Sequence, residues 1–393
     1  MRLSSELLLT FLLNAVWQVP VIACAAALGA WLLERASAKF RHWIWVAALL
    51  LSLLVPSFAT SSIWLNNVPA PVMSEIPVGQ WTAENLSQSS LAVNAPPAIQ
   101  SSTAFVLNAF AAQAIIAVYA AFFLFGVFRF IKAWHTTRRI VGSTQPAESN
   151  DVLDSVLDNC RRLIDPKNVQ VLCSESLPVP VTLGARKPVI ILPTKLVRDG
   201  DAELLTSAIA HEFVHVARSD YFWNLVYEVI YVLLFFHPVA SLMRRRIKQT
   251  RELLCDELVT DRVLEPDIYA RSLVTLASAA PPLNRLSVNA TVGIADADIL
   301  EVRVMSLMNR SKLYPRSRKL LLIGVVLLLA VPSVMAMTLA LRFDVAPFGA
   351  AVIQEQEAKQ KEKEKLKEKL EADRSSAEYR DGLRAGQQEA QRR

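Results

Sequence analysis

Cysteine is rare in this sequence, with four residues in a chain of 393. They are Cys24, Cys160, Cys173 and Cys255, and no two of them form a C-x-x-C pair. This spacing argues against a disulfide framework and against a cysteine-based zinc site. No internal repeat is visible either, so the chain must be divided by its apolar runs and its charges.

Lysine and arginine are absent between about residues 61 and 103, although the chain as a whole has a net charge of +6. The same stretch is rich in proline, serine and asparagine, which predicts a mobile connector rather than a domain. Hydrophobic residues make up 53% of the chain. That share is high for a soluble protein and indicates membrane spans.

Four apolar runs have roughly the 20 residues that a helix needs to cross the hydrocarbon core of a bilayer. They lie at about residues 7–33, 43–63, 104–128 and 320–341. The string "ACAAALGA" in the first run could pass for a signal-peptide cleavage site. The length of that run nevertheless favours an uncleaved span.

Basic residues flank these runs on alternating sides. They follow the first run (Arg35, Lys39 and Arg41), follow the third (Arg129, Lys132, Arg138 and Arg139) and precede the fourth (Lys312, Arg316, Arg318 and Lys319). The positive-inside rule therefore places the N-terminus outside, residues 130–319 inside and the tail outside. The tail is mixed in charge, and we expect a solvated helix there rather than a coiled coil.

A fifth apolar run, at residues 221–243, is long enough to span but conflicts with this arrangement. A single crossing would put the basic cluster that begins at Arg244 on the outer side. The run also contains Glu228 and His237, which are costly in lipid. We therefore expect a buried or membrane-apposed helix of the cytoplasmic domain, unless the run enters and leaves the membrane as a hairpin.

Helix and strand patterns alternate in the region expected to be cytoplasmic. Apolar spacing predicts a helix at residues 150–165, and "NVQVLCSES" predicts a strand. A hairpin follows, with strands at about 179–183 and 189–192 and a turn at 184–187. Pro178 and Pro193 suit an edge strand, which could hold an extended substrate or could simply be a capped hairpin.

The next helix, which begins near Asp201, contains the string H-E-x-x-H at residues 211–215. At this spacing His211 and His215 project from one face and can bind one metal ion. Glu212 lies beside them and can reach a water bound to that metal. Two satisfied histidines on an ordinary helix are the alternative, but the chain has only five histidines and two fall in this window.

A zinc site of this type needs a third protein ligand and an open fourth position. About 40 residues downstream, Glu252 and Asp256 are four apart on a predicted helix and therefore share a face. One carboxylate could bind zinc while the other holds the tautomer of a ligating histidine. A solvated face with helix ion pairs is the alternative for Glu252 and Asp256.

Other polar residues near the motif remain open. His237, in "FFHP", could replace Glu252 as a ligand, but a structural role at a helix break before Pro238 is favoured. Arg218, Asp220 and Asn224 could support the ligands or form an interfacial polar cluster. Candidates for stabilising an oxyanion are Tyr227, Tyr231, Arg218 and His237, with none preferred.

The motifs together resemble the BlaR/MecR-type family of bacterial membrane metallopeptidases, which are antirepressor signal transducers. The matching strings are "HEFVHVARSD" with Asn224, "FFHP", "RELLCDE" and "PVTLGARKPVIILP". The resemblance implies that His211, His215 and Glu252 bind Zn²⁺, that Glu212 is the catalytic base, and that Asp256 supports a ligand. It further implies cleavage of a cytosolic transcriptional repressor, and of the chain itself, after an outside signal.

The sequence departs from the antibiotic-sensing members after the fourth apolar run. Those members have a penicillin-binding sensor domain there, whereas about 50 polar residues follow here, with neither S-x-x-K nor K-T-G. We therefore expect the sensor domain to be lacking. The motifs support a peptidase more strongly than a particular stimulus.

We expect a multi-pass α-helical membrane protein with four spans and a cytoplasmic α+β zincin (gluzincin-like) metallopeptidase domain inserted between spans three and four. The expected parts are residues 1–63 (first two spans), 64–103 (outer loop), 104–130 (third span), 131–319 (peptidase domain), 320–341 (fourth span) and 342–393 (outer tail).

The expected function is a zinc endopeptidase of the bacterial inner membrane that cleaves a cytosolic protein during signal transduction. The expected partners are that protein substrate, which a transcriptional repressor would fit, and the lipid bilayer. Direct binding of nucleic acid is not expected, and a homodimer is left open. Two alternatives are a quality-control or processing peptidase for membrane proteins and a non-catalytic signalling scaffold with structural zinc.

Overall fold

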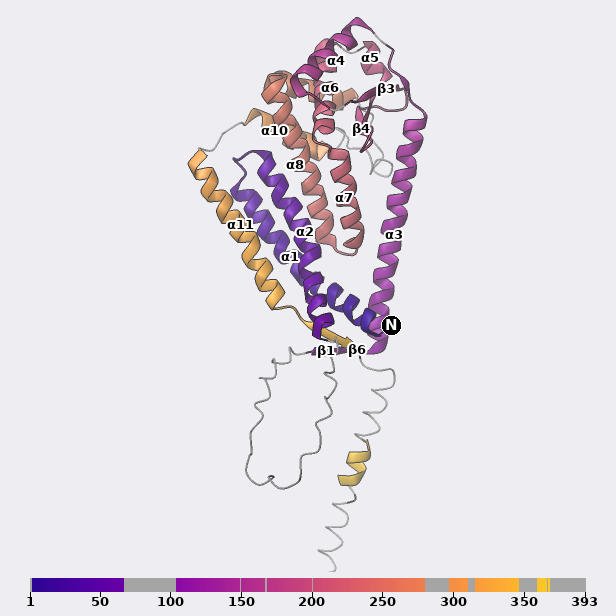
Figure 1. Ribbon diagram of the computed structural model, residues 1–393, viewed down its shortest axis with the longest axis vertical. Coiled ribbons are helices and arrows are strands. Elements are labelled where there is room, and N and C mark those ends of the chain that lie inside the picture. The colour runs from indigo at the N-terminus through magenta and orange to yellow at the C-terminus, as the bar shows by residue number, and fades with distance from the viewer. Residues whose placement is uncertain are drawn as a thin grey trace, which may run out of the picture.

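Helices dominate the computed structural model, in which a long bundle joins a mixed unit that contains a sheet (Figure 1). The structure describes residues 2–66, 104–148, 150–166, 168–199, 201–279, 297–309, 315–345, 359–365 and 367. The bundle comprises α1 (Arg2–Leu32), α2 (Ala38–Asn66), α3 (Ala109–Gly142), α7 (Asp220–Leu233), α8 (Pro238–Arg262) and α11 (Pro315–Thr338). Most of the predicted outer loop and tail therefore lies outside the described residues.

Among the described residues, three helices are long and apolar enough to cross a membrane. They are Ser4–Leu32, Ala38–Phe58 and Ala109–Gly142, which match the first three predicted spans. The predicted fourth span falls in α11, whose apolar part, Leu322–Thr338, is shorter. The four-span topology therefore stays a prediction.

Close helix contacts hold α11 against α1. A Cβ at Gly29 would lie 2.9 Å from Val325 Cγ1, so this glycine lets the two helices approach. The side-chain amide of Gln18 donates to the Ala336 carbonyl, and that of Asn14 donates to the Leu341 carbonyl, both at 2.8 Å. These bonds give the side-chain N–H groups of two buried amides a partner inside an apolar bundle.

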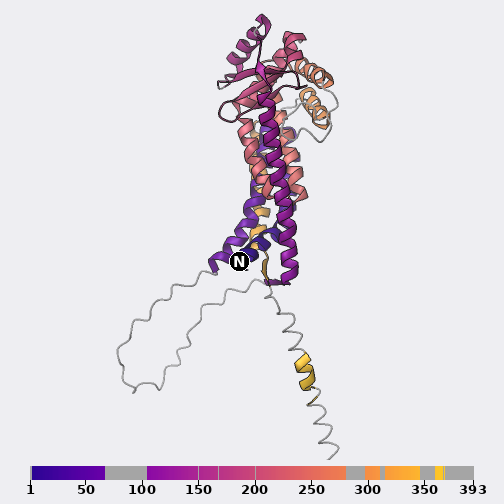
Figure 2. The ribbon, with the colours of Figure 1, turned by 90° about the vertical axis from the view of Figure 1, so that its right-hand side faces the viewer.

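The third span was predicted to begin at residue 104, and this start is wrong. Ala104–Leu107 forms strand β1, which pairs in parallel with β6 (Arg342–Val345) at the end of the bundle far from the four-stranded sheet (Figure 1). Helix α3 begins only after Asn108, whose side chain caps it by accepting from the Phe110 N–H. The helix then continues unbroken through the predicted boundary at residue 130 to Gly142, along the side of the bundle (Figure 2).

The fifth apolar run is two helices rather than the single helix expected. Helix α7 ends at Leu233, and α8 begins at Pro238, so the run folds back on itself. The His237 side chain caps α8 by accepting from the Val239 N–H, and Pro238 suits the first helical turn. Side chains of this hairpin, including Leu234 and Met243, pack in one apolar cluster with α1, α2 and α11.

The mixed unit is built on a sheet with strand order β2-β3-β5-β4. Its elements are β2 (Gln145–Pro146), α4 (Asp151–Ile164), β3 (Gln170–Ser174), β4 (Val181–Leu183), β5 (Val189–Pro193), α5 (Thr194–Asp199), α6 (Ala202–Ala217), α9 (Pro266–Ala279) and α10 (Ala297–Met308). The predicted hairpin is confirmed as the antiparallel pair β4–β5, and β4 is an edge strand. Gly184 has φ +91°, a conformation that favours glycine in the turn.

Helix α8 belongs to both parts of the molecule. Ala240, Met243 and Ile247 in its first half pack in the apolar cluster of the bundle. Cys255 and Val259 in its second half pack in the core of the mixed unit, together with α4, α6 and the sheet. One continuous helix therefore joins the two cores.

Candidate metal centre

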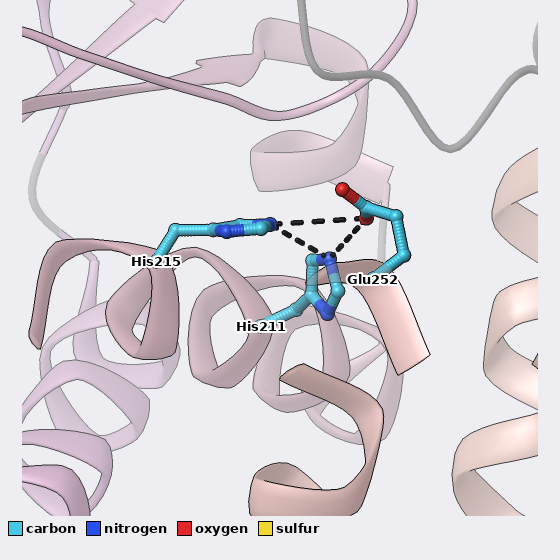
Figure 3. Close-up of side chains that lie close together, drawn as sticks. All are labelled: His211, His215 and Glu252. Carbon is cyan, nitrogen blue, oxygen red and sulfur yellow. Dashed lines mark hydrogen bonds and ion pairs between the residues drawn. The ribbon is translucent and has the colours of Figure 1, made fainter. Parts of the chain in front are cut away.

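Helix α6 presents both histidines of the H-E-x-x-H string on a buried face. The helix begins near Asp201, as the sequence predicted, and Asp201 caps it by accepting from the Leu204 N–H at 2.7 Å. His211 and His215 are 2% and 4% exposed. The rings are 4.7 Å apart between centroids and nearly perpendicular, and both Nε2 atoms point toward Glu252 of α8 (Figure 3).

Three ligand atoms form a small triangle (Figure 3). The Nε2 atoms of His211 and His215 are 3.2 Å apart. Oε2 of Glu252 lies 3.3 Å from Nε2 of His211 and 3.8 Å from Nε2 of His215. A tetrahedral zinc ion with bonds of about 2.0–2.1 Å separates its ligand atoms by about 3.3 Å, so the triangle fits zinc.

The second carboxylate oxygen of Glu252 supports the same fit. Across the part of the chain that the structure describes, Glu252 Oε1 is buried and has no hydrogen-bond partner. The guanidinium Nη2 of Arg251 is 3.6 Å away from it. A buried carboxylate oxygen without a donor is costly unless a cation compensates it, and a bound metal ion would do so.

His215 is held by Asp220 at the start of α7. Ser219 adopts φ 57°, in the left-handed region, and this sharp turn brings Asp220 back toward α6. Oδ2 of Asp220 lies 2.7 Å from Nδ1 of His215. Nδ1–H therefore donates to the carboxylate, which leaves the Nε2 lone pair free for a metal.

His211 is held through a chain of three further groups. The Tyr269 hydroxyl donates to Asp256 Oδ1 at 2.8 Å, so it accepts from Nδ1–H of His211, also at 2.8 Å. Arg303 holds Asp256 with two bonds, from Nε to Oδ2 at 2.8 Å and from Nη2 to Oδ1 at 2.7 Å. Asp256 thus lies beside the site as predicted, but it acts on His211 mainly through Tyr269.

Tyr269 and Arg303 were not found from the sequence. Tyr269 is a single aromatic residue on α9 without a motif around it, so no local signal marks it. Arg303 does leave a trace, because it lies between Ile299 and Leu307 at four-residue steps on α10. All three side chains are buried, and an arginine in an apolar stripe predicts a buried partner of opposite charge.

Electrostatics favour a cation at the triangle. Burial would raise the pKa of Glu252, but the hydrogen bond with His211 and the charges of His215 and Arg251 hold that pKa well below its usual range. Burial would lower the pKa of His215, yet Cys255 and Asp220 raise it well above its usual value. Glu252 is therefore ionised at neutral pH, and the surroundings of His215 stabilise positive charge.

A second group, made by His215 Nδ1, Asp220 and Cys255, is less suited to a metal. Arg218 donates to the Cys255 sulfur at 3.0 Å and lies 3.3 Å from Asp220 Oδ1. A cation placed there would face the guanidinium at short range. Cys255 is fully buried in the core of the mixed unit.

Glu212 points from α6 toward the edge strand. Oγ1 of Thr182, in β4, donates to Glu212 Oε2 at 2.5 Å. A cavity of about 230 Å³ lies beside this contact, and Thr182, His215 and Tyr221 line it. The edge strand and a ligand histidine therefore line one space, and the lining residue Thr182 connects it to the Glu212 carboxylate.

The remaining sequence candidates have other positions. His237 caps α8, so its predicted structural role at a helix break is confirmed. Asn224 accepts from Arg251 Nη1 at 3.0 Å, beside the site rather than in it. Tyr231 stacks under Arg244, with 4.9 Å from the guanidinium carbon to the ring centroid, away from the triangle.

Replacing Arg303 with methionine is expected to weaken zinc binding about 10- to 100-fold, because the groups that orient His211 lose their anchor. Arg303→Met should also lower the free energy of unfolding by about 3–5 kcal/mol, since Asp256 would stay buried without its partner. A competition titration with a chromophoric chelator and a thermal melt measure the two effects. In Arg303→Met/Asp256→Asn, stability should partly return while zinc affinity stays low. Unchanged affinity in Arg303→Met would contradict this role.

Comparison with known proteins gives the class of the chain. A family model described as BlaR1 peptidase M56 matches residues 9–307, which is more than half of the sequence. The match includes the apolar helices α1 to α3, the sheet and the candidate metal centre. The protein is therefore a membrane protein of the peptidase class, and it belongs to the BlaR1 peptidase M56 family.

Individual relatives agree with this family and with the resemblance drawn from the motifs. "Regulatory protein BlaR1" of Staphylococcus aureus is 20% identical over 194 residues, which cover 47% of this chain and 33% of the relative. "Methicillin resistance mecR1 protein" of Staphylococcus aureus (strain Mu50 / ATCC 700699) and of Staphylococcus epidermidis is 27% identical over 93 residues, covering 24% of this chain and 16% of each relative. The chain thus spans a third or less of the length of these relatives.

Proposed function

We propose that this protein is a zinc endopeptidase of the bacterial inner membrane that cleaves a cytosolic protein in signal transduction. The observation that carries the proposal is the triangle of His211, His215 and Glu252, with ligand-atom distances that fit zinc. The carboxylates of Asp220 and Asp256 lie near the Nδ1 atoms of His215 and His211, respectively. The family to which the chain belongs supports peptidase activity.

The proposed chemistry assigns one task to each group. His211, His215 and Glu252 would hold a zinc ion, which would supply Lewis-acid chemistry for the scissile carbonyl and for the attacking water. Glu212 takes the proton of the attacking water and passes it to the leaving amine. Thr182 holds the Glu212 carboxylate by its hydrogen bond and thereby orients it.

The edge strand β4 supplies a place for an extended substrate. Among the described residues, no strand pairs with its outer side, and Thr182 joins it to Glu212. A peptide added there as a further strand would pass beside the candidate base. This supports the substrate-binding interpretation of the hairpin over a purely structural one.

We further propose the predicted topology of four spans, with the peptidase domain, residues 131–319, facing the cytoplasm. Strands β1 and β6 support it, because they bring residue 104 and residue 342 to the same end of the bundle. The residue that follows the expected outer loop and the first residue of the expected outer tail thus meet on one side, opposite the mixed unit (Figure 1). The α7–α8 hairpin enters and leaves the bundle on the peptidase side, which keeps α6 and Glu252 together.

A transcriptional repressor is the proposed substrate, because one relative is a "Regulatory protein" and others are "Methicillin resistance" proteins by name. The test compares new protein N-termini in cells that express the wild-type chain or Glu212→Gln at equal levels. Loss of a single cleavage in a DNA-binding protein in Glu212→Gln cells would support the proposal. Cleavage of many membrane proteins would favour the quality-control alternative, and identical N-termini in both cells would favour the scaffold.

A further inference from the structure

Residues of α3 and α7 line a groove. These two helices lie on the side of the bundle opposite α11 (Figure 1). The volume of the groove is about 580 Å³. The groove closes near the α7–α8 turn, where a Cβ at Gly126 would lie 3.2 Å from the ring of Phe235. At its other end it reaches Tyr221, which also lines the cavity beside His215.

The groove carries an excess of positive charge. Arg129, Lys132 and Arg244 line it, and Glu228 is the carboxylate among its lining residues. Arg244 Nε donates to Glu228 Oε1 at 2.6 Å, so these two charges compensate each other. Among the described residues, Arg129 and Lys132 have no carboxylate partner. The groove therefore presents two uncompensated cations.

Aromatic side chains form the rest of the wall on both helices. Phe125 and Phe128 of α3 are 52% and 61% exposed, and Trp134 lies a few residues further on. Phe235 faces Phe125 at 5.8 Å between ring centroids, and the Arg129 guanidinium carbon lies 5.9 Å above the ring of Phe235. Along α3, an apolar surface thus gives way to cations and then to tryptophan.

This order matches one leaflet, in which acyl chains give way to a headgroup level where lipid phosphates and interfacial tryptophan both lie. We propose that the groove binds an anionic phospholipid. Its phosphate contacts Arg129 and Lys132, and its acyl chains lie against the exposed phenylalanines of α3. The proposal uses the placement of α3 in a membrane and goes beyond the peptidase chemistry, on which it does not depend.

An acidic peptide could satisfy the two cations but would leave the adjoining phenylalanines uncovered. The apolar surface continues along α3. In the apolar span of α3, 6% of the residues are buried, compared with 50% in each of the first two spans. A bilayer lipid covers both parts at once, since one molecule has a charged head and apolar chains. Charge and apolar surface together therefore select the lipid.

The test titrates the purified full chain in mixed micelles with palmitoyl-oleoyl phosphatidylglycerol or with the corresponding phosphatidylcholine. Native mass spectrometry counts the bound lipid. The wild-type chain should retain phosphatidylglycerol preferentially. Arg129→Ala/Lys132→Ala should lower its affinity about fivefold for each cation removed.

The matched control is Arg138→Ala/Arg139→Ala, which removes the same charge from exposed positions of α3 outside the groove. This control should keep the lipid preference. An equal loss of phosphatidylglycerol affinity in both double variants would show that any basic residues near the membrane attract the lipid, and it would overturn the site. The site would also be overturned if the wild-type chain showed no preference for phosphatidylglycerol. It would likewise be overturned if the chain formed a dimer that only Arg129→Ala/Lys132→Ala loses.

The Glu212→Gln chain separates this inference from the proposed function. It should bind phosphatidylglycerol as the wild type does, whether or not the peptidase proposal holds. If the chain proves to bind no zinc but retains the lipid preference, the proposed function fails and the lipid site stands. If it binds zinc and cleaves protein without the preference, only the lipid site fails.

Discussion

Replacing Glu212 with glutamine is expected to leave zinc in place and to slow peptide cleavage about 10²- to 10⁴-fold. The amide has the size of the carboxylate and can still accept from Thr182, but it cannot take a proton from water. His211 and His215 keep Asp220 and Tyr269 as partners, so the metal ligands are undisturbed. Initial rates and zinc content of the purified full chain give the two readouts.

Glu203→Gln provides a control for the Glu212 variant, because it makes the same change at an exposed position of α6. It should retain both zinc and cleavage. Wild-type cleavage by Glu212→Gln would refute the assignment of this carboxylate as the base. Loss of zinc in that variant would instead show that Glu212 holds the metal or the fold of the site.

Truncating Glu252 to alanine is expected to reduce zinc occupancy at least about tenfold and to abolish cleavage, because two histidines alone leave the metal without its third protein ligand. The change also leaves Arg251 and Arg303 buried without the negative charge of Glu252, so the free energy of unfolding should fall. Inductively coupled plasma mass spectrometry measures zinc per chain, and circular dichroism measures folding.

Glu252→Gln distinguishes ligation from folding, since it preserves the side-chain volume. It should fold nearly as the wild type and still bind zinc weakly. Glu203→Ala, an exposed truncation on α6, should leave zinc content unchanged. If Glu252→Gln binds zinc with wild-type affinity, the third ligand is a different residue.

The parts of the fold predicted correctly from sequence depend on short-range pattern. Helix α6 was predicted to begin near Asp201, and the β4–β5 hairpin was predicted from its two strands and the turn between them. Four-residue spacing predicted that Glu252 and Asp256 share one face of a helix, and the packing of α8 on α6 brings Glu252 close to the histidines. The chemical roles of these residues remain predictions until they are tested.

The features that were missed depend on contacts between distant parts of the chain. Arg303 reaches Asp256 across 47 positions, and the parallel pairing of β1 with β6 joins segments on either side of the peptidase unit. The α7–α8 turn was only partly predicted, for a different reason. An apolar run of more than 20 residues favours one helix, so the hairpin was left as an alternative although a helix break before Pro238 was favoured; the His237 cap in the structure shows that the chain reverses there.

Because α8 is one continuous helix, a movement of its first half among the apolar helices is transmitted to the metal centre on its second half. The first half of α8 is held by the packing of Met243 and Ile247 in the bundle, and Glu252 lies nine residues after Met243, about 14 Å along the axis. A tilt of about 5° around Met243 would displace Glu252 by roughly 1.2 Å, more than twice the tolerance of about 0.5 Å for a functional constellation. A small rearrangement of the apolar helices is thus large enough to assemble or dismantle the triangle of ligand atoms.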